Sequence, residues 1–73
     1  MNEIKRPFDL LNRAVGKKVV VGVKGGTHFE GKMMAFDVHM NIALAEAKEK
    51  GSEEVFNNLF IRGDSVVYVK PLE

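Results

Sequence analysis

The sequence has no cysteine and no tryptophan, only one tyrosine and two prolines, and almost no net charge. Without cysteine, disulfides and thiolate metal sites are excluded. Two histidines, His28 and His39, are too few for a structural metal site, and we expect neither a metal nor a cofactor. A formal net charge of +1 gives no strong bulk attraction to nucleic acid or to an anionic membrane, so any cations that bind RNA must be clustered locally.

Long apolar runs are missing as well. No stretch approaches the length of a membrane span, and the N-terminus lacks the apolar centre of a signal peptide. We therefore expect a soluble, cytoplasmic protein. With 73 residues, the chain is expected to form a single domain, 1–73, which buries only about 60% of its unfolded surface. Domains of this size without disulfides or metals often gain stability by oligomerising.

Helical spacing of apolar residues occurs only near the N-terminus. Pro7 suits the first turn of a helix, and Phe8 and Leu11 recur at helical spacing. Gly16 is a natural stop signal. The pattern predicts an amphipathic helix of about two turns that caps one end of a small core and needs tertiary support.

Five short runs after this helix have the composition of β-strands and are separated by turn signals. They cover residues 19–23, 27–36, 40–47, 55–61 and 65–69. Gly31 marks a sharp bend or a close backbone approach, and Pro71 is expected to end the pairing. The predicted fold is mostly β, with a short N-terminal α-helix followed by a strongly bent five-stranded antiparallel small barrel. The last two runs are apolar and almost uncharged, so sheet edges built from them are expected to pair with a neighbouring chain.

Polar residues alternate within AFDVHMNIAL, residues 35–44. Asp37, His39 and Asn41 occupy every second position, which places them on one face of a strand or in a tight turn leading into one. The segment IRGDS, residues 61–65, adds Arg62, whose planar cation stacks on bases and binds phosphate. Histidine also stacks, and a carboxamide binds a base edge with a donor and an acceptor. These are the components of a nucleotide pocket, although turn residues with local hydrogen bonds give the same spacing.

Both segments resemble the two signature motifs of Sm and Sm-like proteins. The first motif is matched by Phe29, Gly31, Asp37, Met40, Asn41 and Leu44, and the second by Ile61, Arg62, Gly63, Asp64 and Val66. The N-terminal RPFDLLNRAVGKKVVVGVKGG resembles the helix and first strand of archaeal members. The resemblance implies the Sm fold and a homo-oligomeric ring, commonly a heptamer, in which the fourth strand of one subunit pairs with the fifth strand of the next.

The resemblance also implies a function in binding uridine-rich single-stranded RNA at the inner rim of the pore, within RNA processing or ribonucleoprotein assembly. By motif position, His39 and Arg62 are expected to sandwich a uracil. Asn41 is expected to bind the uracil edge, and Gly63 with Asp64 to contribute through the loop backbone.

Two further motif residues, Asp37 and Met40, are expected to support the loop rather than to touch the base. Cations near the helix, Lys5, Arg6 and Arg13, are expected to be ordinary surface charges rather than a second RNA-binding face. The ring size, six, seven or another number, stays open at this point.

Other functions fit the sequence less well. A hydrolytic triad of Asp37, His39 and Ser65 lacks the nucleophile-elbow and oxyanion motifs, so we expect no enzyme and no catalytic residues. A small barrel that binds peptides in an aromatic-lined groove would need exposed Trp or Tyr. A bacterial Hfq-type RNA chaperone shares the fold, but its second motif differs from IRGD. The peptide-binding barrel and the Hfq-type chaperone remain the alternatives.

Overall fold

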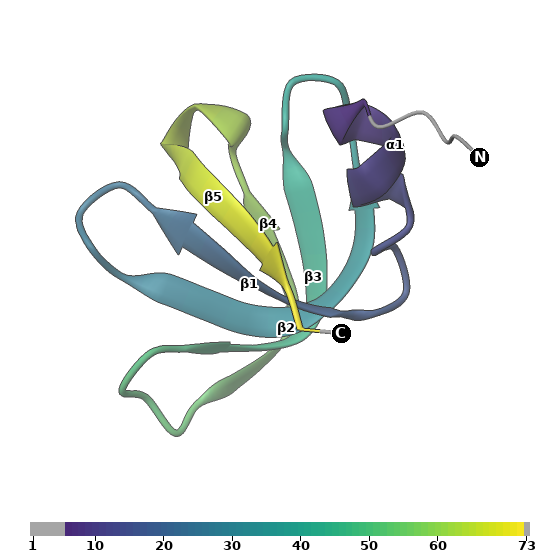
Figure 1. Ribbon diagram of the computed structural model, residues 1–73. Coiled ribbons are helices and arrows are strands. Elements are labelled where there is room, and N and C mark those ends of the chain that lie inside the picture. The colour runs from purple at the N-terminus through teal and green to yellow at the C-terminus, as the bar shows by residue number, and fades with distance from the viewer. Residues whose placement is uncertain (1–5, 73) are drawn as a thin grey trace.

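A computed structural model describes residues 6–72, so Lys5 lies outside the described residues. Figure 1 shows one short helix and five strands. The elements are α1 (Pro7–Asn12), β1 (Lys18–Val23), β2 (His28–Phe36), β3 (Ile42–Glu49), β4 (Val55–Ile61), a 3₁₀ turn (Gly63–Ser65) and β5 (Val66–Pro71). The predicted helix and the five predicted strands are confirmed, and the largest shift is in the third strand, which starts at Ile42 and ends at Glu49.

All five strands form one antiparallel sheet in the order β4-β3-β2-β1-β5. The sheet is strongly bent, as Figure 1 shows. It is not closed, because β4 and β5 form its two edges and no pairing between them is present within residues 6–72. The prediction of a mostly β fold with a strongly bent five-stranded antiparallel sheet is therefore confirmed.

The bend arises where the registers of β2 and β3 shift. A Cβ atom on Gly31 would lie 3.0 Å from the Ala45 carbonyl oxygen, so glycine allows the two strands to approach closely without a tight contact. The predicted close approach at Gly31 is confirmed. Opposite it, Glu46 has a φ of 53° and lies in the stretch of β3 that carries one residue more than β2. Such a bulge increases the local bend and twist of a strand.

The core consists mainly of side chains from the inner faces of β1, β2 and β3, and it also includes Ala14 and Ile61. Its largest fully buried members are Met33, Ile42, Leu44, Val19 and Val21. The six-residue helix α1 is too short to be stable alone, and none of its residues is fully buried. It is held by packing of Leu11 on the core and by a tilted ring contact between Phe8 and Phe36. Within residues 6–72, no helix is long and apolar enough to span a membrane.

The prediction that Pro71 ends the pairing is wrong. Pro71 is the last residue of β5 and lies opposite Val19, and the Leu72 N–H donates to the Lys18 carbonyl oxygen at 3.1 Å. Because β5 pairs with β1 on one side only, an edge position tolerates a residue without an N–H.

Both edge strands expose large apolar side chains. Val55 and Phe60 on β4 are 53% and 77% exposed, and Val67 and Tyr68 on β5 are 62% and 48% exposed. The predicted apolar character of these edges is confirmed. Lys70 is the only charged residue of the two edge strands, and exposed edges with so little charge are templates for pairing with another chain.

Candidate nucleic-acid interface

The segment between β2 and β3 is a tight turn, the second of the two arrangements that the alternation allowed. The Met40 N–H donates to the Asp37 carbonyl oxygen at 2.9 Å, and the Asp37 N–H donates to the Asn41 carbonyl oxygen at 3.2 Å. Met40 has a φ of 64°, in the left-handed region, and its half-buried side chain packs against the core. This packing offsets the cost of a conformation that a methionine rarely adopts.

The Asp37 carboxylate is the centre of the turn. Its Oδ1 accepts hydrogen bonds from the backbone N–H groups of His39 at 2.9 Å and Asn41 at 3.0 Å, and its Oδ2 accepts one from the Asn41 side-chain Nδ2 at 3.1 Å. These donors, the Asn41 side chain foremost, lower the pKa of Asp37 below its ordinary value. An ionised Asp37 therefore fixes the path of the backbone on either side of His39.

Asn41 connects this turn to the second motif. Its Oδ1 accepts a hydrogen bond from the Gly63 N–H at 2.7 Å, and its Nδ2 donates to Asp37. Because the two partners differ in polarity, they fix which end of the carboxamide is oxygen and which is nitrogen. One N–H and one oxygen lone pair of Asn41 remain for a ligand. A Cβ atom on Gly63 would overlap the His39 carbonyl oxygen, so glycine is needed for the two loops to approach this closely.

The two stacking candidates are both open to solvent. His39 is exposed. Arg62 leads into the 3₁₀ turn, and its Nη2 lies 3.4 Å from Asp64 Oδ2, with side chains 83% and 67% exposed. An exposed ion pair of this kind is weak, so a ligand can displace it. The structure thus gathers His39, Asn41, Arg62, Gly63 and Asp64 on two loops joined by one hydrogen bond, and their contacts with RNA stay a prediction.

A hollow of about 450 Å³ adjoins these loops. Its lining includes Asn41 and Arg62 together with Ala35, Ala43 and Phe60. The sequence interpretation did not place Phe60 beside the candidate site. The available signal was its position two residues before Arg62, which continues the extended backbone after β4, because residues two apart in an extended segment share a face.

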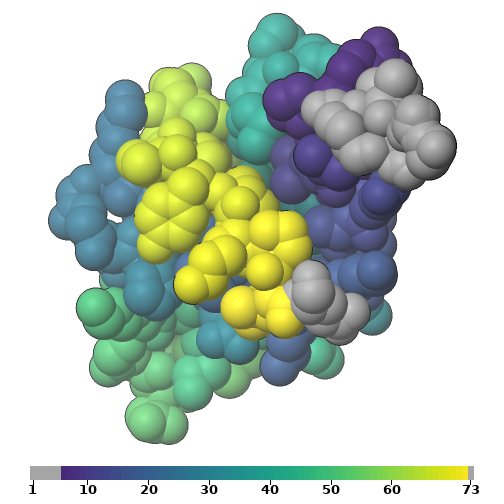
Figure 2. Space-filling view, in the orientation of Figure 1, coloured from purple at the N-terminus to yellow at the C-terminus, as the bar shows by residue number. Residues whose placement is uncertain are grey.

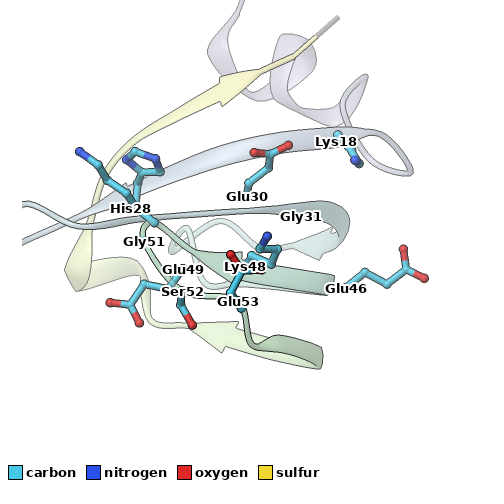
Figure 3. Close-up of a pocket in the computed structure, with 11 residues that line it drawn as sticks. Lys18, His28, Glu30, Gly31, Glu46, Lys48, Glu49, Gly51, Ser52 and Glu53 are labelled. Atoms are coloured by element: carbon cyan, nitrogen blue, oxygen red, sulfur yellow. The ribbon is translucent and has the colours of Figure 1, made fainter.

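A second hollow, of about 540 Å³, includes Gly31 and Glu46 of the sheet bend in its lining and is shown in Figure 3. Its lining mixes Glu46, Glu49 and Glu53 with Lys18, His28 and Lys48. His28 is half-buried here. Within the described residues, no three His, Cys, Asp or Glu side chains are arranged to hold a metal ion.

Comparison with known proteins covers almost the whole chain. Residues 9–71 match the LSM domain. A snRNP Sm-like protein of Methanosarcina acetivorans is 45% identical over 69 residues, which cover 90% of this chain and 96% of the relative. The Sm protein of Pyrococcus abyssi, solved in complex with a uridine heptamer, has a TM-score of 0.85 at 34% identity, covering 92% of this chain and 99% of that one. The SmAP1 heptamer of Pyrobaculum aerophilum has a TM-score of 0.87 at 25% identity, covering 97% of this chain and 99% of that one.

Proposed function

This chain belongs to the LSM family of Sm-like proteins, and on that premise we propose that it forms a ring that binds uridine-rich single-stranded RNA. The observation that carries the proposal is the link from Asp37 through Asn41 to the Gly63 N–H. It joins the loop that displays His39 to the loop that displays Arg62. The similarity to a P. abyssi protein solved with a uridine heptamer supports the same ligand class. The protein acts by binding, without catalytic turnover, in RNA processing or ribonucleoprotein assembly.

The fixed carboxamide of Asn41 supports the proposal of a preference for uracil over cytosine. Uracil presents a carbonyl acceptor beside an N–H donor, and the remaining N–H and lone pair of Asn41 complement that order. Cytosine presents the reverse order, a donor beside an acceptor. Asn41 cannot rotate to suit it without losing the bonds to Asp37 and Gly63. Specificity thus comes from the cost of the wrong base as much as from the bonds to the right one.

Assembly multiplies the weak single site. One stacked base contributes about 1–3 kcal/mol, which is too little to retain a nucleotide alone. We propose that the exposed edge of β4 in one subunit pairs with β5 of the next until a ring closes, with seven subunits as in the P. aerophilum relative. Each further base then binds from a high effective concentration. Affinity should rise steeply with oligouridine length and level off near one nucleotide per subunit.

The test compares oligouridine and oligocytidine binding at one fixed salt concentration, because phosphate contacts make affinity salt-dependent. Arg62→Ala should weaken both ligands through the loss of charge and stacking. Asn41→Ala should mainly lower the uracil-to-cytosine ratio. Arg13→Ala, the same change at an exposed helix end, is the matched control and should alter neither. An unchanged ratio in Asn41→Ala would refute the assignment of the pocket.

Native mass spectrometry tests the ring separately. Val67→Pro places a residue without an N–H in the middle of edge strand β5 and should yield monomers. Retention of the ring by this variant would show that β5 is not the pairing edge. An intact native ring that binds no RNA would instead support the protein-interaction alternative.

A further inference from the structure

An apolar hollow of about 680 Å³ lies between α1 and the edge strand β5. Several of its lining residues are half-buried and pack against the core, so the hollow continues the core toward the β5 edge; they are Leu11, Phe36, Met40, Val66 and Val69. Figure 2 shows β5, in yellow, uncovered at the front of the molecule, with α1, in purple, to its upper right. Open apolar surface beside a free strand edge is typical of an interaction site.

The order of the strands determines which side of β4 faces this hollow in the proposed ring. From β4 to β5 the strand direction reverses four times, so the two edge strands run in the same direction along the sheet. An antiparallel joint, the more stable kind of pairing, therefore requires that one subunit be turned over relative to the next. Turning it over places the outer face of its β4 on the same side of the joint as the inner, core-facing side of the next β5, whatever the bend of the sheet.

Phe60 is the largest side chain on the outer face of β4. It lies opposite Ala43, which alternates with the buried Ile42 and Leu44, and it is 77% exposed. Full-length antiparallel pairing of β4 with the β5 of the next subunit brings Phe60, the last residue but one of β4, to the start of β5 at Val66. Directly opposite residues share a face. The Phe60 ring would therefore enter the hollow of the next subunit beside Val66.

The same hollow reaches the back of the two loops of the uridine pocket. Asp37, Met40 and Gly63 contribute to its lining. Met40 holds a left-handed φ of 64°, and packing against the core is what keeps it there, yet its side chain is only half-buried. An aromatic ring that packs on Met40 from a neighbouring subunit adds contacts to this strained residue. It would thereby stabilise the turn that displays His39.

From these observations we propose that Phe60 of one subunit fills the hollow between α1 and β5 of the next subunit and positions the uridine loops of that next subunit. The inference rests on the ring and the uridine pocket proposed above. Phe60 is a positioning residue, because it acts on His39 and Asn41 through Met40 and does not touch the base. Assembly and uridine binding are then coupled, since a pocket reaches its full affinity only when a neighbouring β4 occupies the hollow behind it.

Disulfide formation tests the packing directly, because the chain has no cysteine of its own. Phe60→Cys combined with Val66→Cys should cross-link each subunit to the next on mild oxidation, which gives a ladder of covalent oligomers on a non-reducing gel. The control combines Phe60→Cys with Tyr68→Cys on the outer face, where a Cβ atom on Gly22 would overlap the Tyr68 ring. A ladder from the Tyr68 pair and none from the Val66 pair would show that Phe60 lies on the other side of the joint, and this overturns the proposal.

Mixed rings test whether Phe60 acts on its own pocket or on that of its neighbour, with uridine monophosphate as a ligand too small to bridge two pockets. Phe60→Ala rings should bind it roughly 5-fold or more weakly than rings of Val55→Ala, an exposed apolar truncation at the other end of β4. Arg62→Ala rings lack the stacking cation but keep Phe60. When Phe60→Ala and Arg62→Ala rings exchange subunits in equal amounts, about a quarter of the subunits combine an intact pocket with an intact neighbouring Phe60, because each subunit supports one neighbour. Affinity at these sites should be restored.

The outcomes separate this inference from the proposed function. An intact ring of the unaltered chain that binds neither uridine monophosphate nor oligouridine refutes the uridine pocket, and this inference with it. If the unaltered ring binds uridine and Phe60→Ala leaves the affinity unchanged, or mixing does not restore it, only the inference is overturned. If Phe60→Ala does not assemble, the milder truncation Phe60→Val takes its place in the mixing experiment, and the cysteine pairs decide the packing independently.

Discussion

Gly63→Ala isolates the contact between the two loops of the uridine pocket. The added methyl group would overlap the His39 carbonyl oxygen, which belongs to the backbone and cannot rotate away. Relief of this overlap requires the loops to separate. Separation stretches the 2.7 Å hydrogen bond from the Gly63 N–H to Asn41 Oδ1, the only side-chain bond between the two loops within residues 6–72. The side chains of His39 and Arg62 then no longer share a fixed spacing.

The magnitude follows from three contributions. Loss of the hydrogen bond costs about 0.5–1.5 kcal/mol. Displacement of packed backbone adds to this, within the roughly 0.5–3 kcal/mol typical of destabilising substitutions. Reduced freedom of the unfolded chain returns about 0.4–1 kcal/mol. We therefore expect a net loss of about 1–2 kcal/mol, which lowers the Tm by roughly 4–16 °C in a domain of this size. Oligouridine affinity should fall at least about tenfold, since stacking is impaired at every subunit.

Thermal unfolding and paired titrations with oligouridine and oligocytidine measure both effects. Gly31→Ala is the matched control. Its added Cβ would lie 3.0 Å from the Ala45 carbonyl oxygen at the sheet bend, so it should also destabilise the fold. It should leave the uracil-to-cytosine ratio of the folded protein intact, while Gly63→Ala should reduce that ratio. A Gly63→Ala protein with native Tm and native selectivity would refute the role of the loop contact.

Three further substitutions or conditions probe the strained and charged positions. The pKa of Asp37 lies below its ordinary value of 3.8, so the contribution of this carboxylate to stability is complete above pH 3.8 and is lost as the pH falls through the lowered pKa. Urea midpoints measured across this pH range should show the decline, and Asp37→Ala should remove the part that Asp37 contributes. Glu46→Asn should raise the free energy of unfolding by about 0.5–1 kcal/mol in urea titrations, because asparagine tolerates the left-handed φ of 53° better; an unchanged midpoint would argue against strain there. Gly22→Ala should destabilise the otherwise unchanged protein much more than it destabilises the Tyr68→Ala variant, because the added Cβ atom overlaps the Tyr68 ring. Additive effects in this double-mutant cycle would contradict the packing of Tyr68 on Gly22.

The course of the chain could be predicted from sequence because its signals are local. Pro7 and Gly16 bracket the helical segment, and branched residues with turn signals define the strands. The last two runs were expected to leave apolar, almost uncharged sheet edges, and the strand order places β4 and β5 at the two edges. Pro71 was misjudged because its effect depends on which side of the strand is paired, and a sequence does not contain that information.

The candidate site was predictable as a set of residues but not as a geometry. The spacing of Asp37 and Asn41 fits both a strand and a turn, and the choice depends on the left-handed Met40, for which methionine gives no signal. The bond between Asn41 and Gly63 joins residues 22 positions apart, so it exists only after the sheet has folded. For the same reason Tyr68 and Gly22, which carry no signal in the sequence, acquire a meaning only through their register.

The two ends of the sheet are different strands, and this difference has a consequence for the number of subunits. Because β4 cannot pair with another β4 in the same manner as with β5, copies of the chain join head to tail. The rotation that relates one subunit to the next is then set by the angle between the β4 edge and the β5 edge of a single subunit. Gly31 and Glu46 determine much of that angle, although neither lies on an edge strand. A substitution that opens the bend would convert the closed ring into a ring with more subunits, or into a helical filament of subunits that does not close.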